Sequence, residues 1–119
     1  MRVLLIDDNA LTRYTIKSLL EKLGHEVVAE AEDGPGALKY FGELKPDVVF
    51  LDLILPGMSG EEILAALRVT NPAVRVVVVT AVAQDELDRR LTGKGVSFIL
   101  RKPFSFDAFR VLMKELTEA

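Results

Sequence analysis

Residues 46 to 57 read PDVVFLDLILPG, and this stretch decides how the chain folds. Between Asp47 and Pro56 it is apolar on both faces of a strand, apart from Asp52 in its middle. Strands that are apolar on both faces are typical of parallel sheets covered by helices on either side. Because burial of an unpaired carboxylate is costly, we expect Asp52 to lie at the open end of such a strand, with partners around it.

Short apolar runs recur along the chain and predict five strands, at residues 2–6, 26–30, 47–51, 74–80 and 96–100. Segments with the spacing of amphipathic helices lie between them, and a last helix is predicted to bury Phe106, Phe109, Leu112 and Leu116. Strict alternation of strands and helices predicts parallel strands joined by right-handed crossovers. We therefore expect one α/β domain over residues 1–119, with a parallel sheet between two layers of helices.

The composition excludes several classes of function. A net charge of -3 offers no general attraction to nucleic acid or to an anionic membrane, so we expect neither direct nucleic-acid binding nor membrane insertion. The chain has no cysteine, which excludes thiol catalysis and disulfides and fits a cytoplasmic protein. Two acids end the apolar run of MRVLLIDD too early for a signal peptide.

Polar residues stand where the apolar runs stop. They are Asp7 and Asp8 after the first run, Asp52 after the third, Thr80 at the end of the fourth and Lys102 just past the fifth. Ligands of open α/β sheets bind beyond the carboxyl ends of the strands, so these residues are the candidates for a site. Taken alone, most have a plain structural role, such as a cap of the following helix at Asp8 or Asn9. Asp52 has apolar neighbours on both sides, so it is not an ordinary solvent-exposed aspartate.

The combination of these side chains indicates a particular chemistry. Three clustered carboxylates repel one another unless a cation shares the pocket, and a hard divalent ion, Mg²⁺ or Mn²⁺, suits oxygen ligands best. Lys102 alone cannot balance three acids, but it could bind an anion held by the metal. A carboxylate, a divalent metal, a hydroxyl and an ammonium around one point form a site for phosphoryl transfer, in which an aspartate can form an acyl phosphate.

The stretches LLIDDN, DVVFLDLILPGMSG, VVVVTA and RKPF together resemble the CheY-like receiver domain of bacterial two-component response regulators, over essentially the whole chain. Pro56 and Gly60 stand four and eight residues after Asp52, as in the phosphoacceptor motif of that family. Lys102 and Pro103 match its lysine and proline after the fifth strand. The resemblance implies the flavodoxin-like, doubly wound fold with strand order 2-1-3-4-5.

The resemblance also implies how phosphate and metal are bound. Asp52 would accept a phosphoryl group from a phosphohistidine on a sensor histidine kinase or a histidine phosphotransfer protein. Asp8, Asp52 and the backbone carbonyl of Ile54 would bind Mg²⁺ directly, and Asp7 would act mainly through water. Thr80 would bond a phosphoryl oxygen, and Lys102 would pair with another.

Two positions bear on how phosphorylation is signalled. The peptide between Lys102 and Pro103 would be cis, as in the family. Many members carry an aromatic residue three positions before the lysine, and here that residue is Ile99. Because neighbours in a strand point to opposite faces, Phe98 is no obvious substitute. We therefore expect signalling to depend on the Thr80 loop and the helix that follows it.

Two apolar residues predict a long-lived phosphoryl group. In this family, the residues two after the aspartate and two after the threonine flank the path of the hydrolytic water. Here they are Ile54 and Val82, which crowd a water molecule and cannot orient it. The protein would therefore be no enzyme toward other substrates, but a switch that catalyses only its own phosphorylation and slow dephosphorylation.

Three other classes share part of this pattern. Phosphatases of the haloacid dehalogenase type need a second acid two residues after the nucleophile, where this chain has Ile54. Flavin-binding modules need a Ser/Thr/Gly-rich phosphate loop after the first strand, and DDNALTR would repel phosphate instead. A degenerate receiver that serves only as a protein-binding scaffold would not need the full set of acidic, hydroxyl and lysine positions, and all of them are present.

Two kinds of output fit the sequence. A stand-alone regulator would bind its effector on the surface formed by the fourth helix, the fifth strand and the fifth helix. Phosphorylation could also drive dimerisation. The chain could equally be the receiver of a longer regulator that carries an output domain.

Overall fold

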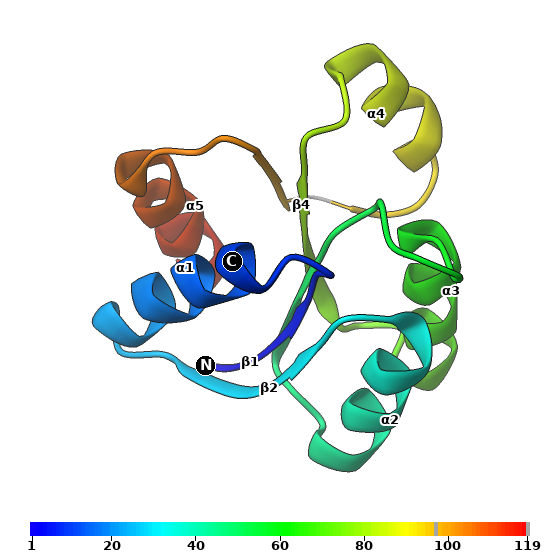
Figure 1. The fold of residues 1–119 in the computed structure, drawn as a ribbon, viewed down its shortest axis with the longest axis horizontal. Coiled ribbons are helices and arrows are strands. Elements are labelled where there is room, and N and C mark those ends of the chain that lie inside the picture. The colour runs from blue at the N-terminus through cyan, green and yellow to red at the C-terminus, as the bar shows by residue number, and fades with distance from the viewer. Residues whose placement is uncertain (97, 119) are drawn as a thin grey trace.

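The computed structural model describes residues 1–96 and 98–118. Within this part of the chain, five strands and five helices alternate (Figure 1). The strands are β1 (Arg2–Ile6), β2 (Glu26–Ala31), β3 (Val48–Leu51), β4 (Arg75–Thr80) and β5 (Phe98–Arg101). The helices are α1 (Ala10–Lys22), α2 (Gly34–Leu44), α3 (Gly60–Thr70), α4 (Gln84–Leu91) and α5 (Phe106–Glu118).

The strands form one parallel sheet in the order β2-β1-β3-β4-β5, which confirms the predicted fold. From β1 the chain first moves outward to β2, and it then returns to the other side of β1 to form β3. The direction of winding therefore reverses between β1 and β3. In open α/β sheets, a crevice for ligands lies at this reversal, beyond the carboxyl ends of the strands.

Alternate residues of each strand build two cores, one on each face of the sheet. Leu4 and Ile6 pack with the buried side chains of α2, α3 and α4, whereas Val3 and Leu5 pack with those of α1 and α5. Figure 1 shows the same division of the helices between the two faces. All four residues of β3 are buried, as expected for a central strand that is apolar on both faces.

The strand boundaries differ slightly from those predicted. β3 begins at Val48, and the exposed Asp47 before it accepts a hydrogen bond on its carboxylate from the amide of Arg2, at 2.7 Å. β5 begins at Phe98 and extends to Arg101, whose partner in β4 is Thr80. Residue 97 of the predicted fifth strand and residue 119 of the predicted domain lie outside the described residues.

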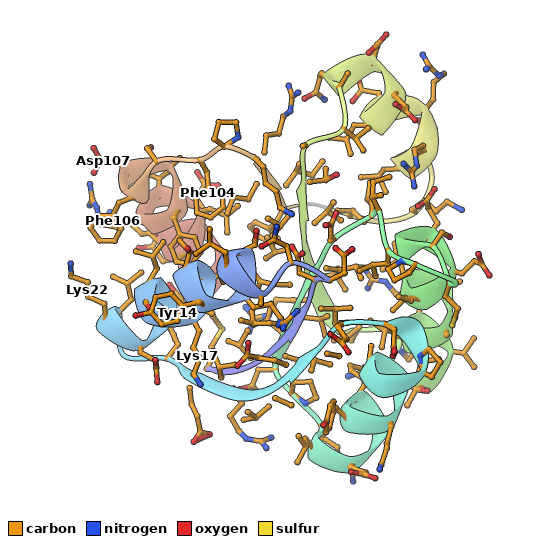
Figure 2. The ribbon with its side chains drawn as sticks, in the orientation of Figure 1. Tyr14, Lys17, Lys22, Phe104, Phe106 and Asp107 are labelled. Carbon is orange, nitrogen blue, oxygen red and sulfur yellow. The ribbon has the colours of Figure 1, made fainter. Side chains whose placement is uncertain are left out.

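One predicted core residue of α5 was wrong. Phe109, Leu112 and Leu116 are buried together with Met113, but Phe106 is 39% exposed. It is the first residue of α5, and Phe104 rather than Phe106 stacks on Phe109, with ring centroids 5.9 Å apart. The ammonium of Lys22 on α1 lies 5.2 Å from the centroid of the Phe106 ring, within reach of a cation–π contact (Figure 2).

In the described part of the chain, none of the helices has the length and apolar character that a membrane crossing requires.

Candidate functional site

The polar residues singled out from the sequence meet at one edge of the sheet. Asp7 and Asp52 follow β1 and β3, Thr80 ends β4, and Lys102 follows β5. Backbone hydrogen bonds hold these positions in the frame of the sheet. The amide of Asp52 donates to the carbonyl of Ile6 at 3.0 Å, and the amide of Lys102 donates to the carbonyl of Thr80 at 2.9 Å. The sheet therefore brings the ends of these strands to one edge, where the side chains of Asp7, Asp52 and Lys102 contact one another.

A lysine ammonium bridges two buried carboxylates at this point. The Nζ atom of Lys102 lies 2.8 Å from Oδ2 of Asp7 and 3.1 Å from Oδ2 of Asp52. Asp7 is 4% exposed and Asp52 is 6% exposed. Each acid also accepts a backbone hydrogen bond, from Asn9 to Asp7 at 2.8 Å and from Ile54 to Asp52 at 3.1 Å. These contacts compensate for the loss of water around both carboxylates.

Burial and charge shift the protonation of this pair. Burial raises the pKa of Asp52 above its ordinary value, although the bonds from Ile54 and Lys102 oppose the shift, and the charge of Asp7 adds to it. Burial alone would lower the pKa of Lys102, but its hydrogen bonds to Asp7 and Asp52 outweigh burial and raise that pKa. Lys102 is therefore cationic at neutral pH, whereas burial disfavours the charged form of Asp52 relative to its protonated form.

A third acid completes a set of oxygen donors. Asp8 is exposed, and one carboxylate oxygen from each of Asp7, Asp8 and Asp52 lies within 4.8 Å of the other two. Lys102 supplies one ammonium, bonded to Asp7 and Asp52, against these three carboxylates, so the group of four keeps excess negative charge. A compact group of carboxylate oxygens with net negative charge is compatible with Mg²⁺. Ile54 lies in the loop that follows β3 and is 57% exposed.

Thr80 presents a hydroxyl to the same edge. The residue is fully buried, and its Oγ1 accepts a hydrogen bond from the amide of Val82 at 3.2 Å. A hydroxyl oxygen that accepts one bond can still donate its proton to another acceptor. Beside it, a pocket of about 400 Å³ is lined by Ala81, Lys102 and Phe104 together with residues of α1.

The structure settles two predictions about the fifth strand. The Lys102–Pro103 peptide is cis, as predicted. Ile99 packs against the core beneath α2, α3 and α4, whereas Phe98 packs against the core beneath α1 and α5. The expectation that Phe98 points away from Ile99 is therefore confirmed.

The spacing between Asp52 and Gly60 also has a structural reason. Gly60 is the first residue of α3, and a Cβ atom there would lie 2.5 Å from Cα of Leu53 and 2.7 Å from the carbonyl oxygen of Asp52. No side chain fits at that distance. Ser59 caps the helix in a capping box with Glu62 and thereby fixes its first turn against the loop.

Sequence reasoning missed two residues near the site. Arg90 of α4 donates two hydrogen bonds to Glu61 of α3, from Nε at 2.8 Å and from Nη2 at 2.6 Å. The same Nη2 atom lies 3.5 Å from the carbonyl oxygen of Leu53, next to Asp52. The two side chains are 29 residues apart along the chain, and no local pattern marks their pairing.

Comparison with known proteins places this arrangement in a family. Residues 3–114 match the model of the response regulator receiver domain. The chemotaxis protein CheY of Listeria monocytogenes is 36% identical over 107 residues, which cover 90% of each chain. The receiver domain of AraT, a response regulator from Geobacillus stearothermophilus, superposes with a TM-score of 0.88 at 30% identity, over 98% of this chain and 92% of that one.

A CheX–CheY–BeF3–Mg complex from Borrelia burgdorferi shares the fold with a TM-score of 0.91, at 22% identity over 98% of this chain and 89% of that one. The chain belongs to the response regulator receiver domain family. Receiver domains are signalling domains of two-component systems, and they pair with sensor kinases and effector domains.

Proposed function

We propose that residues 1–119 form a receiver domain whose Asp52 accepts a phosphoryl group in a Mg²⁺-dependent reaction. The donor is a phosphohistidine on a sensor histidine kinase or a histidine phosphotransfer protein. The observation that carries this proposal is the ammonium of Lys102 held within 3.1 Å of the buried carboxylates Asp7 and Asp52, with the oxygens of Asp8 beside them. A cation that bridges two acids at a strand edge can exchange one of them for a phosphoryl oxygen.

The transfer itself needs little covalent chemistry from the protein. A carboxylate oxygen of Asp52 attacks the phosphorus atom, a new O–P bond forms, and the P–N bond to the donor imidazole breaks. The imidazole nitrogen takes a proton from water as it leaves. Because Asp52 is nearly buried, few water molecules compete with the incoming phosphoryl group.

Residues of the chain would hold the transferred group. Lys102 pairs with one phosphoryl oxygen, and the hydroxyl proton of Thr80 is donated to another. Asp7, Asp8, Asp52 and the carbonyl of Ile54 are the groups that would hold Mg²⁺ or Mn²⁺. When bound, the ion supplies positive charge that neutralises the phosphoryl oxygens.

The acyl phosphate is expected to hydrolyse slowly. Ile54 is exposed two residues after Asp52, and Val82 is half-buried two residues after Thr80. Neither side chain can hydrogen bond to an attacking water molecule. The protein then serves as a switch and not as an enzyme with turnover on other substrates.

The output surface that we propose is the face of α4, β5 and α5. A groove of about 830 Å³ runs along β5 and α5 and is lined by residues that include Ile99, Arg101 and Val111. Its mixed polar and apolar lining suits a protein partner, which would be an effector, an output domain or a second copy of this chain after phosphorylation.

The test uses acetyl phosphate as a small phosphodonor and measures the intact mass of the full chain. We expect a gain of one phosphoryl group with Mg²⁺, and no gain with a chelator or in Asp52→Asn. Asp47→Asn is the matched control, because Asp47 is an exposed acid at the opposite end of β3. Absence of a mass gain in the wild-type chain, or an equal gain in Asp52→Asn, would overturn the proposal.

A further inference from the structure

The helix α4 is attached to its neighbour by a fork of two hydrogen bonds. Arg90, one residue before the end of α4, binds both carboxylate oxygens of Glu61 in the first turn of α3. Both side chains are only about one-fifth exposed, and the bond from Arg90 lowers the pKa of Glu61. A bidentate, partly buried pair of this kind has a defined geometry, unlike a mobile pair on the surface.

The first turn of α3 is in turn locked against the loop after β3. The amide of Gly60 donates to the carbonyl of Leu53 at 3.0 Å, and the missing side chain of Gly60 lets the two backbones touch. The guanidinium of Arg90 lies 3.5 Å from that same carbonyl oxygen. Arg90 therefore reaches the loop of Asp52 both directly and through Glu61.

We propose that Arg90 is a positioning residue that couples α4 to the loop of residues 52–54, so that this loop binds the divalent cation well only while the Arg90–Glu61 pair holds α4 in place. The inference rests on the proposed function, since it concerns the same site. Coupling between two sites is reciprocal, so a cation or a phosphoryl group at Asp52 also biases the position of α4. Figure 1 shows α4 on the same side of the sheet as α3, where the pair can connect them.

Simple electrostatics makes a different prediction, which allows a sharp test. If Arg90 acted only as a positive charge near the site, its removal would strengthen Mg²⁺ binding, whereas removal of the negative Glu61 would weaken it. If the pair positions the loop, the loss of either partner must weaken Mg²⁺ binding. The sign of the two changes therefore separates the two explanations.

The experiment measures the Mg²⁺ dissociation constant of the full chain by NMR titration of the amide signals. The proteins are the wild type, Arg90→Gln, Glu61→Gln, the double variant and Arg89→Gln. Arg89 is the matched control, because it carries the same charge on the same helix but is exposed and lies 3.9 Å from Asp85. We expect about three- to thirtyfold weaker binding for each single variant at Arg90 and Glu61, with no further loss in the double variant.

Changes of opposite sign at Arg90 and Glu61, or changes no larger than that of Arg89→Gln, would overturn the inference. Arg90→Lys is a milder variant should Arg90→Gln fail to fold: it keeps the charge but cannot form the fork. It is expected to weaken Mg²⁺ binding, and unchanged binding would refute the positioning role. A wild-type chain that binds no Mg²⁺ would instead refute the proposed function.

Discussion

Replacement of Lys102 by methionine removes the ammonium that bridges Asp7 and Asp52 and leaves a side chain of similar length. Both acids stay buried, at 4% and 6% exposure, and their nearest counter-charge is lost. We expect the variant to be less stable than the wild type in the presence of a chelator at neutral pH. The cost arises from two carboxylates that must stay desolvated without a cation.

The magnitude follows from the exposure of the pair. Loss of one partner of a fully buried ion pair costs about 3–5 kcal/mol. The side chain of Lys102 is 22% exposed and the site opens at the edge of the sheet, so water can screen the remaining acids. Roughly half of that cost, about 2 kcal/mol in the free energy of unfolding, is therefore expected.

The pH dependence identifies the cause. The hydrogen bond from Lys102 opposes the rise in the pKa of Asp52, so its loss raises that pKa further. A carboxyl group whose pKa is higher in the folded than in the unfolded state stabilises the fold at low pH. This stabilisation is lost as the pH rises from the unfolded-state pKa to the folded-state pKa. The stability deficit of Lys102→Met should therefore be small near pH 4 and full at about pH 8. Saturating Mg²⁺ should also reduce the deficit, because the ion replaces the missing positive charge.

Urea unfolding followed by far-UV circular dichroism measures these differences, with a chelator and with Mg²⁺. Lys39→Met is the control, because Lys39 is an exposed lysine of α2, and its effect should stay within about 0.5 kcal/mol. A deficit in Lys102→Met that changed neither with pH nor with Mg²⁺ would show that Lys102 acts by packing, and the electrostatic reasoning would be refuted.

Three further predictions concern residues of the same edge. Asp52→Asn should raise the free energy of unfolding in chelator by on the order of 1 kcal/mol near neutral pH, because the raised pKa of Asp52 means that its charge opposes folding at that pH. Urea titration measures this change, and a loss of stability would contradict the prediction. Gly60→Ala should cost about 2 kcal/mol in the same titration, since its Cβ would lie 2.5 Å from Cα of Leu53, and a neutral effect would show that the loop can move aside. Ile54→Asn should shorten the phosphoryl lifetime severalfold, measured as decay of the phosphorylated mass after donor removal, and a half-life of seconds in both proteins would refute the role given to Ile54.

The parts of the fold that could be predicted are those with a strong local signal. The apolar runs of β3 and before Thr80 predict central parallel strands, and parallel strands bring their carboxyl ends to one edge. The meeting of Asp7, Asp52 and Lys102 therefore followed from chain order and strand direction, although their distances did not.

Other features depend on how helices meet in space. Phe106 has helical spacing with Phe109, but its place at the first residue of α5 exposes it, and Phe104 covers Phe109 instead. The pairing of Arg90 with Glu61 depends on the approach of α4 to α3, which neither helix encodes alone. Side chains that meet across elements are set by packing and leave no periodic trace in the sequence.

The most direct test of the central claim is to identify which side chain carries the phosphoryl group. The chain is phosphorylated with acetyl phosphate and Mg²⁺, the acyl phosphate is reduced with borohydride, and the product is sequenced by tandem mass spectrometry. Reduction of an aspartyl phosphate leaves homoserine in place of the aspartate. We expect homoserine at position 52 alone, and none when a chelator replaces Mg²⁺. Homoserine at Asp7 or Asp8, or at no position in a chain that still gains phosphate, would contradict the account.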